Sequence, residues 1–191
     1  MHSGRPGPGI LSNSMHPAVF LDRDNTLIAN DGDLGDPDGV VLLEGVREGL
    51  GRLHRGGFRL VVVTNQGGVA RGRYDEAAVH AVHDRIQELT GRPPLSFYYC
   101  PFHPGGTVLE YAREHPWRKP APGMLREAAD RESLDLESSW MIGDQPRDAE
   151  AGRAAGCRTI LLAGSADSTG EADHVATGFL EAVDLVLGDG A

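Results

Sequence analysis

The sequence predicts an α/β fold with a doubly wound parallel sheet, and two features of the chain indicate it. Short apolar runs alternate with segments in which apolar residues recur at helical spacing. The runs are apolar throughout instead of alternating with polar residues, which is typical of parallel strands that helices cover on both faces. The pattern continues from residue 17 toward the C-terminus without an internal repeat, so we expect a single domain over residues 16–191.

The individual elements follow from the same pattern. Five strands are expected, at residues 18–21, 60–63, 97–99, 140–142 and 159–162. Helices are expected at residues 46–53, 78–89, 124–128, 149–155 and 179–186. Asp75 is the expected N-cap of the second helix, because its side chain can accept from the free N–H groups of the first turn. Residues 1–15 are rich in Gly, Pro and Ser and are expected to form a disordered leader, with no apolar stretch suited to a signal peptide.

Composition excludes several classes of protein. The net charge is −10, and such a surface repels a phosphate backbone, so no nucleic-acid partner is expected. No apolar run approaches the ~20 residues that span a bilayer, so no membrane partner is expected either. The two cysteines, Cys100 and Cys157, are too few for a disulfide framework, which favours a reducing cytoplasm.

Three small polar residues mark the expected site. Asp22, Thr64 and Asp144 each come at the end of an apolar run. In an open parallel sheet, ligands bind outside the carboxyl ends of the strands. One such residue is often an ordinary strand terminator, but three together favour a functional site at this edge of the sheet.

Carboxylates dominate this predicted site. Asp22 and Asp24 are two residues apart, so in extended backbone both side chains lie on the same face. One carboxylate can then act as nucleophile and the other as general acid and base. Asp144 and Asp148 supply further oxygens, and hard oxygen ligands with room for water and phosphate suit Mg²⁺. The alternative is a solvated acidic turn.

Phosphate-binding groups are predicted in two loops. Thr64, Asn65 and Gln66 precede a glycine pair, and their hydroxyl, amides and backbone N–H groups suit phosphate oxygens, although a similar composition is common in turns. Arg118 stands beside Lys119, which is the one lysine among 18 basic residues. A cationic pair here suits a phosphate and an acidic cluster, and the alternative is a solvated loop.

Taken in order, these motifs resemble the haloacid dehalogenase superfamily of phosphotransferases, over about residues 19–162. The resemblance implies that Asp22 is the nucleophile, which takes the phosphoryl group as an aspartyl-phosphate, and that Asp24 is the acid and base. It further implies that Thr64 binds the phosphoryl group and that Lys119 balances charge. Asp22, Asp24 through its carbonyl, and Asp144 are the implied Mg²⁺ ligands. Asp148 is the implied supporting residue, orienting Lys119 or a metal-bound water.

Longer segments narrow the resemblance. FLDRDNTL, VVTNQGGVARG, YYCPFHPGG and WRKPAPGML resemble the branch that contains D-glycero-D-manno-heptose 1,7-bisphosphate phosphatase and the histidinol-phosphatase domain. Only 41 residues separate Asp22 from Thr64, so no large cap domain is expected. Surface loops must then select the substrate. Arg71 and Arg118, with Asn65 and Gln66, are the candidate substrate-binding residues, the two arginines for the distal phosphate of a sugar bisphosphate.

The chain departs from that branch in one loop. Many relatives have two histidines and two further cysteines there, closing a structural zinc site. Phe102 replaces the first histidine, and His115 and Trp117 stand where the two cysteines would be, so only Cys100, His103 and His115 could still bind a metal there. A closed zinc site needs four N or S ligands, so structural zinc is predicted to be absent.

The sequence therefore predicts a monomeric, Mg²⁺-dependent phosphatase for a small phosphorylated sugar, with heptose bisphosphate as the leading substrate. Histidinol phosphate or another small sugar phosphate is the alternative within enzymes. A catalytically silent phosphate-binding module is the alternative from another class, and the intact set of Asp22, Asp24, Lys119 and Asp144 disfavours it.

Overall fold

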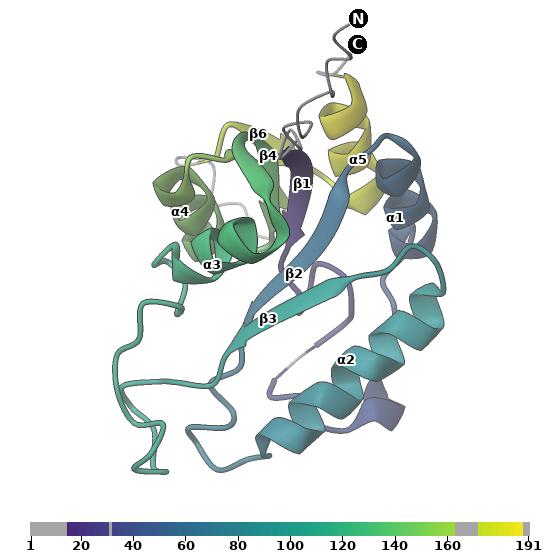
Figure 1. The fold of residues 1–191 in the computed structure, drawn as a ribbon. Coiled ribbons are helices and arrows are strands. Elements are labelled where there is room, and N and C mark those ends of the chain that lie inside the picture. Colours follow the sequence, from purple (N-terminus) through teal and green to yellow (C-terminus); the bar gives the residue numbers. More distant parts are fainter. Residues whose placement is uncertain (1–14, 31, 163–171, 189–191) are drawn as a thin grey trace, which may run out of the picture.

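A computed structural model describes residues 15–30, 32–162 and 172–188, and its centre is a six-stranded sheet. The strands are β1 (His16–Leu21), β2 (Arg59–Asn65), β3 (Ser96–Cys100), β4 (Leu134–Gly143), β5 (Arg158–Leu162) and β6 (His174–Ala176). They lie in the order β3-β2-β1-β4-β5-β6, and every neighbouring pair is parallel (Figure 1). The predicted fold class is confirmed.

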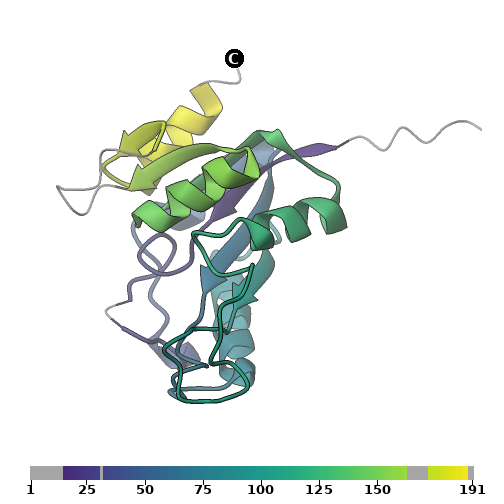
Figure 2. The same cartoon turned by 90° about the vertical axis from the view of Figure 1, so that its left-hand side faces the viewer.

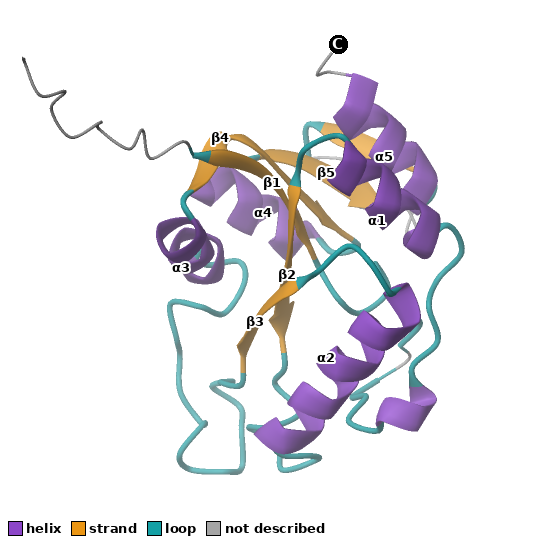
Figure 3. Cartoon of the chain, turned by 45° about the vertical axis from the view of Figure 1, so that its right-hand side comes forward, coloured by secondary structure: helices purple, strands orange, loops and turns teal. Residues whose placement is uncertain are grey.

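Helices cover both faces of this sheet, as a doubly wound fold requires. They are α1 (Val46–Arg55), α2 (Glu76–Thr90), α3 (Gly123–Glu132), α4 (Pro146–Ala155) and α5 (Phe179–Gly188), with a short 3₁₀ helix, η1 (Pro37–Gly39). Helices α1, α2 and α5 lie on one face and α3 and α4 on the other (Figures 2 and 3). Within the described ranges, none of these helices has the length and apolar character needed to cross a membrane.

The apolar runs exist because each central strand supplies two hydrophobic cores. In β1, Val19 and Leu21 pack under α1, α2 and α5, while Ala18 and Phe20 pack under α3 and α4. All four side chains are fully buried. Burial of each larger one stabilises the fold by about 1.5–3 kcal/mol, so a polar residue inside these strands would be costly on either face.

Most predicted elements are confirmed, and the differences lie where the apolar signal is weak. The Asp75 side chain accepts from the Ala78 N–H at 2.9 Å, as an N-cap should. The first half of β4 was not predicted, because residues 135–139 are mostly polar. β6 was not predicted either, and it is only three residues long. Helix α4 begins one turn earlier than expected, with a proline in its first turn. Most of the expected leader, residues 1–14, lies outside the described residues.

Two loop segments extend beyond the carboxyl ends of the strands. The chain between β1 and α1 forms a short flap that contains η1, in place of a separate cap. The segment between β3 and α3 is a long loop that runs well beyond the end of the sheet (Figure 1). Any ligand at this edge of the sheet therefore meets loops, as the short spacing between the first two motifs predicts.

One buried histidine in this fold makes stability depend on pH. His83 on α2 is 4% exposed and stacks on Phe97, with 4.5 Å between ring centroids. Burial lowers the pKa of His83 to about 3, and the nearby charges of Arg23 and His80 add to the shift. His83 is therefore neutral in the folded protein, whereas in the unfolded chain it titrates near its ordinary pKa of about 6.5.

We expect mild acid to destabilise the protein through His83. Below pH 6.5 the proton binds the unfolded chain preferentially, so folding loses about 1.4 kcal/mol per pH unit down to the folded-state pKa. When the pH falls from 7 to 5, the free energy of unfolding should therefore decrease in both proteins. The decrease should be about 2 kcal/mol smaller in His83→Leu than in the unmodified protein. Chemical denaturation at the two pH values measures this difference, and equal losses in both proteins would contradict it.

Candidate active site

The candidate site lies where the chain reverses its direction of travel across the sheet. β1 and β4 are neighbours in the sheet but far apart in sequence, and this switch point is where open α/β sheets bind ligands. Asp22 follows the last residue of β1, Asp144 follows the last residue of β4, and Thr64 lies at the end of β2. The three strand ends therefore meet at one edge, as predicted.

A buried ion-pair cluster forms the floor of the site. The Lys119 ammonium lies 2.9 Å from Oδ1 of Asp22 and 2.7 Å from Oδ1 of Asp148, and it donates to the Val63 carbonyl at 2.7 Å. An ammonium has three N–H donors, so these contacts use all of them. The Lys119 side chain is fully buried. The single lysine of the chain is therefore an internal counter-ion of the two aspartates.

The backbone around this cluster is shaped to hold it. The Asn65 amide makes two hydrogen bonds to the Lys119 backbone, at 2.9 and 3.0 Å, and so fixes the lysine loop to the end of β2. Asp148 accepts from the Gln145 N–H at 3.0 Å and caps α4. A Cβ on Gly143 would lie only 2.3 Å from the Asp148 carboxylate, so glycine is required at that position.

The cluster contains more negative than positive charge. Ligand oxygens of Asp22, Asp144 and Asp148 lie within 4.8 Å of one another, and Lys119 is the ammonium among them. Burial raises the pKa of Asp22 to about 6; Lys119 opposes this shift and Asp148 adds to it. Burial also raises the pKa of Asp144. Two negative charges are left unbalanced, which suits a divalent cation.

Asp24 is held on the other side of the site. Arg23, Asn30 and Gln66 all donate hydrogen bonds to its carboxylate, at 2.8 to 3.1 Å. Arg23 is fully buried and Gln66 is 1% exposed. Gln66, a predicted substrate-binding residue, thus uses its amide within the protein.

A cavity of about 580 Å³ opens beside Asp24. Three arginines line it: the candidate substrate-binding residues Arg71 and Arg118, and Arg147 from the first turn of α4. Asp33 binds Arg71 through two hydrogen bonds, at 2.5 and 3.2 Å. Arg118 makes a hydrogen bond to the Phe102 carbonyl at 3.3 Å. Among the described residues, no carboxylate pairs with Arg118 or Arg147.

The Arg118 guanidinium is a partly buried positive charge with two other arginines nearby. Burial lowers its pKa, and repulsion from Arg147 and Arg71 adds to the effect. The Nη1 atoms of Arg71 and Arg118 both lie close to Gly67. A Cβ built on Gly67 would be 3.0 Å from Nη1 of Arg71 and 3.5 Å from Nη1 of Arg118. Converging guanidinium groups with few internal acids create a site for an anion.

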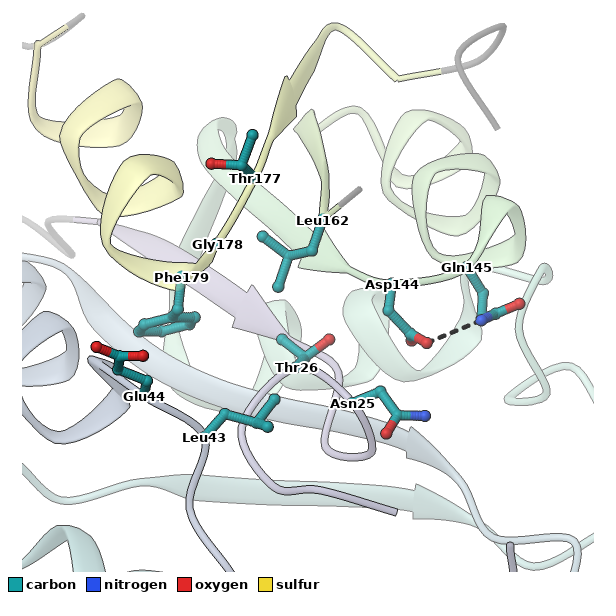
Figure 4. Close-up of a pocket in the computed structure, with 10 residues that line it drawn as sticks. All are labelled: Asn25, Thr26, Leu43, Glu44, Asp144, Gln145, Leu162, Thr177, Gly178 and Phe179. Atoms are coloured by element: carbon teal, nitrogen blue, oxygen red, sulfur yellow. Dashed lines mark hydrogen bonds between the residues drawn. The ribbon is translucent and has the colours of Figure 1, made fainter. Parts of the chain in front are cut away.

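A second cavity, of about 570 Å³, reaches Asp144 between the flap and the start of α5 (Figure 4). Figure 4 shows Gln145 donating to the Asp144 carboxylate, a bond of 2.8 Å. The charged side chains on the wall of this cavity are Glu44 and Asp144, both acidic. Its lining therefore repels phosphate, whereas the arginine-lined cavity attracts it.

Sequence reasoning missed several residues of the site: Arg23, Asn30, Asp33, Tyr74 and Arg147. Arg23 had a local signal, because an arginine between two aspartates has charged neighbours on both sides. Asn30, Asp33 and Tyr74 come from loops whose paths the apolar pattern does not predict. Arg147 was not predicted as a site residue, because α4 was expected to begin two residues after it.

The loop that departs from the zinc-binding pattern is packed with aromatic rings. His115 stacks on Phe102 at 4.3 Å between centroids, and the Arg113 guanidinium lies 4.2 Å from the Phe102 centroid. Nδ1 of His115 accepts from the Trp117 N–H, and Nδ1 of His103 accepts from the Gly105 N–H. Cys100 is buried, which raises the pKa of its thiol.

We predict that the purified protein holds no tightly bound zinc. In the described part of the chain, the ligand atoms of Cys100, His103 and His115 are not gathered as those of the aspartate cluster are. Elemental analysis of protein purified without chelator is the measurement. One equivalent of zinc that disappears in Cys100→Ser would contradict the prediction.

Comparisons with known proteins agree with this geometry. The HAD-hydrolase-like family model matches residues 116–186. The D-glycero-beta-D-manno-heptose-1,7-bisphosphate 7-phosphatase of Escherichia coli K12 is 38% identical over 84% of this chain and 86% of its own length. The corresponding enzyme of Thermosynechococcus vestitus is 38% identical over 89% and 95%. The crystal structure of D,D-heptose 1,7-bisphosphate phosphatase from B. bronchiseptica, complexed with magnesium and phosphate, has a TM-score of 0.76 at 27% identity, covering 92% of this chain and 99% of that one. The chain therefore belongs to the family of haloacid dehalogenase-like phosphatases.

Proposed function

We propose that this phosphatase removes one phosphoryl group from a sugar bisphosphate, converting D-glycero-D-manno-heptose 1,7-bisphosphate to the 1-phosphate. The curated relatives support the substrate, since they carry that activity in their names over most of this chain's length. The observation in the structure that carries the proposal is the charge of the cavity beside Asp24.

The cavity has an excess of positive charge. Arg23 pairs with Asp24, and Asp33 pairs with both Arg71 and Arg73, which leaves Arg118 and Arg147 facing the cavity without a carboxylate partner among the described residues. A phosphate monoester carries a charge of about −1.5 to −2 at pH 7, so a second phosphate on the substrate matches this excess. Histidinol phosphate has a cationic amine at its other end, which these arginines would repel.

Magnesium is the proposed cofactor, and the residues present fit it. The excess of two negative charges around Asp22, Asp144 and Asp148 calls for a divalent cation, and all the donors are hard oxygens. Asp22, Asp144 and the Asp24 carbonyl are the proposed ligands, because Asp148 already pairs with Lys119 and caps α4. When bound, the ion neutralises charge on the phosphoryl oxygens and so favours attack on phosphorus.

The reaction is proposed to proceed in two displacements at phosphorus. A carboxylate oxygen of Asp22 attacks phosphorus, the bond to the sugar oxygen breaks, and Asp24 gives that oxygen a proton. A water molecule then attacks the aspartyl-phosphate, Asp24 takes its proton, and the bond to Asp22 breaks. Thr64 binds a phosphoryl oxygen, and Lys119 keeps Asp22 paired while its charge changes. Asn65 fixes the lysine loop.

The second-phosphate site can be tested with Arg118→Gln. Because Arg118 would contact only the distal phosphate, kcat/KM for a sugar bisphosphate should fall by about 10-fold or more, the value of one charge-assisted hydrogen bond. The loss on the matching monophosphate should be several-fold smaller. Steady-state kinetics on heptose bisphosphate anomers, heptose 7-phosphate and histidinol phosphate provide the comparison.

An exposed arginine outside the cavity serves as the matched control. Arg131→Gln, on α3, removes the same charge far from the cavity and should leave the ratio of the two kcat/KM values unchanged. Equal losses on bisphosphate and monophosphate in Arg118→Gln, or faster turnover of histidinol phosphate than of any bisphosphate, would contradict the proposed substrate class.

The organisation of the protein forms part of the same proposal. We infer a single phosphatase domain over residues 16–191 acting as a monomer, since the described helices and strands share one sheet and its two cores. Both cysteines are buried and unpaired, which supports a cytoplasmic setting.

A further inference from the structure

We propose that Gln66 is a positioning residue that orients two groups of the reaction at once, the Asp24 carboxylate and the Thr64 hydroxyl. The inference rests on the proposed function, because it assigns these two groups their tasks. It differs from the expectation that Gln66 contacts substrate. The basis is a complete set of hydrogen bonds around one buried amide.

The contacts of Gln66 leave one orientation for its amide. Its Oε1 accepts from the Arg23 guanidinium at 2.9 Å and from the Tyr74 hydroxyl at 2.8 Å. Arginine has donors and no acceptor, so the amide oxygen must face it and the NH₂ group must face the other way. The NH₂ group donates its two protons to Oδ2 of Asp24 at 2.9 Å and to Oγ1 of Thr64 at 2.8 Å.

The first consequence is the polarity of the Thr64 hydroxyl. Because Oγ1 accepts a proton from Gln66, its own O–H is left to donate elsewhere. Thr64 is 1% exposed and lies at the end of β2, so the direction of this bond is set by the strand and by Gln66. A hydroxyl oriented as a donor is what binding of a phosphoryl oxygen requires.

The second consequence distinguishes the two oxygens of Asp24. Oδ1 accepts from Nε and Nη2 of Arg23, both at 3.1 Å, and from the Asn30 amide at 2.8 Å. Oδ2 accepts from Gln66 alone among the described residues. Three donors leave Oδ1 no place for a proton, so Oδ2 is the oxygen that gives a proton to the leaving group.

Tyr74 completes the hold on the amide. Its ring fills the space beside Gly68, where a Cβ would lie only 2.3 Å from the ring, so the close approach requires glycine. Burial raises the pKa of Tyr74 to about 12, and the hydroxyl therefore stays protonated and able to donate to Gln66. Arg23 and Tyr74 together keep the Gln66 amide from flipping.

The test is Gln66→Glu, which keeps the size of the side chain and replaces its two donors by an acceptor. The introduced carboxylate would repel the Asp24 carboxylate and draw the Thr64 proton away from substrate. The measurement is kcat/KM with Mg²⁺ on two probes, p-nitrophenyl phosphate and 2-glycerol phosphate. Nitrophenolate leaves without a proton, whereas an alkoxide needs one, and proton transfer contributes about 10²–10⁴-fold.

We expect Gln66→Glu to lower kcat/KM on both probes, and at least about tenfold more on 2-glycerol phosphate because proton transfer is impaired. Tyr74→Phe, which removes one bond and keeps the ring, should shift the ratio of the two kcat/KM values in the same direction by less. Gln87→Glu is the structural control: Gln87 holds the end of α2 through the carbonyls of Gly91 and Pro93, so its replacement should lower the melting temperature without moving the ratio.

Two results would overturn the inference. One is an unchanged ratio in Gln66→Glu; the other, decisive if that variant does not fold, is an unchanged ratio in Tyr74→Phe. Asp24→Asn separates this inference from the proposed function. A ratio that shifts in Asp24→Asn but not in the Gln66 and Tyr74 variants rejects the positioning role alone, and no shift in Asp24→Asn rejects the task assigned to Asp24.

Discussion

Asp22→Asn should lower kcat for every phosphate ester by on the order of 10⁶-fold, the size of loss that removal of a covalent nucleophile produces. An amide nitrogen and a neutral carbonyl cannot form the aspartyl-phosphate. The fold should remain, because Asn keeps an oxygen for the Arg23 N–H and the Lys119 ammonium. Steady-state kinetics on p-nitrophenyl phosphate with Mg²⁺ measure the loss.

Stability provides the control for Asp22→Asn. Burial raises the pKa of Asp22 to about 6, so the ionised carboxylate is less favourable in the folded protein than in the unfolded chain. Removing that charge should therefore leave the melting temperature unchanged or higher. More than a trace of wild-type activity in a well-folded variant would mean that Asp22 is not the nucleophile.

Lys119→Arg is the second large effect. The ammonium is fully buried and is surrounded by three acceptors at 2.7–2.9 Å, whereas a guanidinium is planar and larger. The substitution keeps the charge but displaces Asp22, and misplacement of a reacting group by about 1 Å costs about 10²-fold in rate. We therefore expect kcat/KM to fall by about that factor or more, together with a lower melting temperature.

The exposed Arg131 on α3 supplies the reverse exchange as a control. Arg131 pairs with Glu127 one turn away, and Arg131→Lys should change neither activity nor stability measurably. Near-normal kinetics in Lys119→Arg would show that the site needs only a positive charge at this position and not a compact ammonium.

Much of this fold was predictable because its central strands are buried on both faces. Val19 and Phe20 point into different cores, so the sequence there is apolar at every position and the strand is easily recognised. β6 gave no such signal, since it is short, lies at the edge of the sheet and begins with a histidine. The elements with a weak apolar pattern are the ones that could not be predicted from the sequence.

The residues of the site likewise fall into a group that the sequence predicts and a group that it does not. Asp22, Thr64 and Asp144 were predictable because parallel strands end at one edge. Asn30 and Gln66 were not predictable as partners of Asp24, because they reach it through side-chain contacts between separate loops. Arg147 likewise joins Arg118 only through the packing of α4 against the sheet. Contacts of this kind depend on loop paths, which periodicity does not encode.

If Asp22 carries the phosphoryl group during the reaction, Asp24→Asn should trap the covalent species. p-Nitrophenolate departs without a proton, so this variant should still transfer phosphoryl to Asp22 when Mg²⁺ is present. Hydrolysis of the aspartyl-phosphate should be slow, because no base activates the water. The covalent species should therefore accumulate.

The measurement is intact-protein mass after acid quench of Asp24→Asn with p-nitrophenyl phosphate, followed by peptide mapping. We expect a burst of one nitrophenolate per chain and a protein heavier by one phosphoryl group, located on Asp22 and lost in Asp22→Asn/Asp24→Asn. Nitrophenolate release without any phosphorylated protein, or a phosphoryl group on another residue, would contradict it.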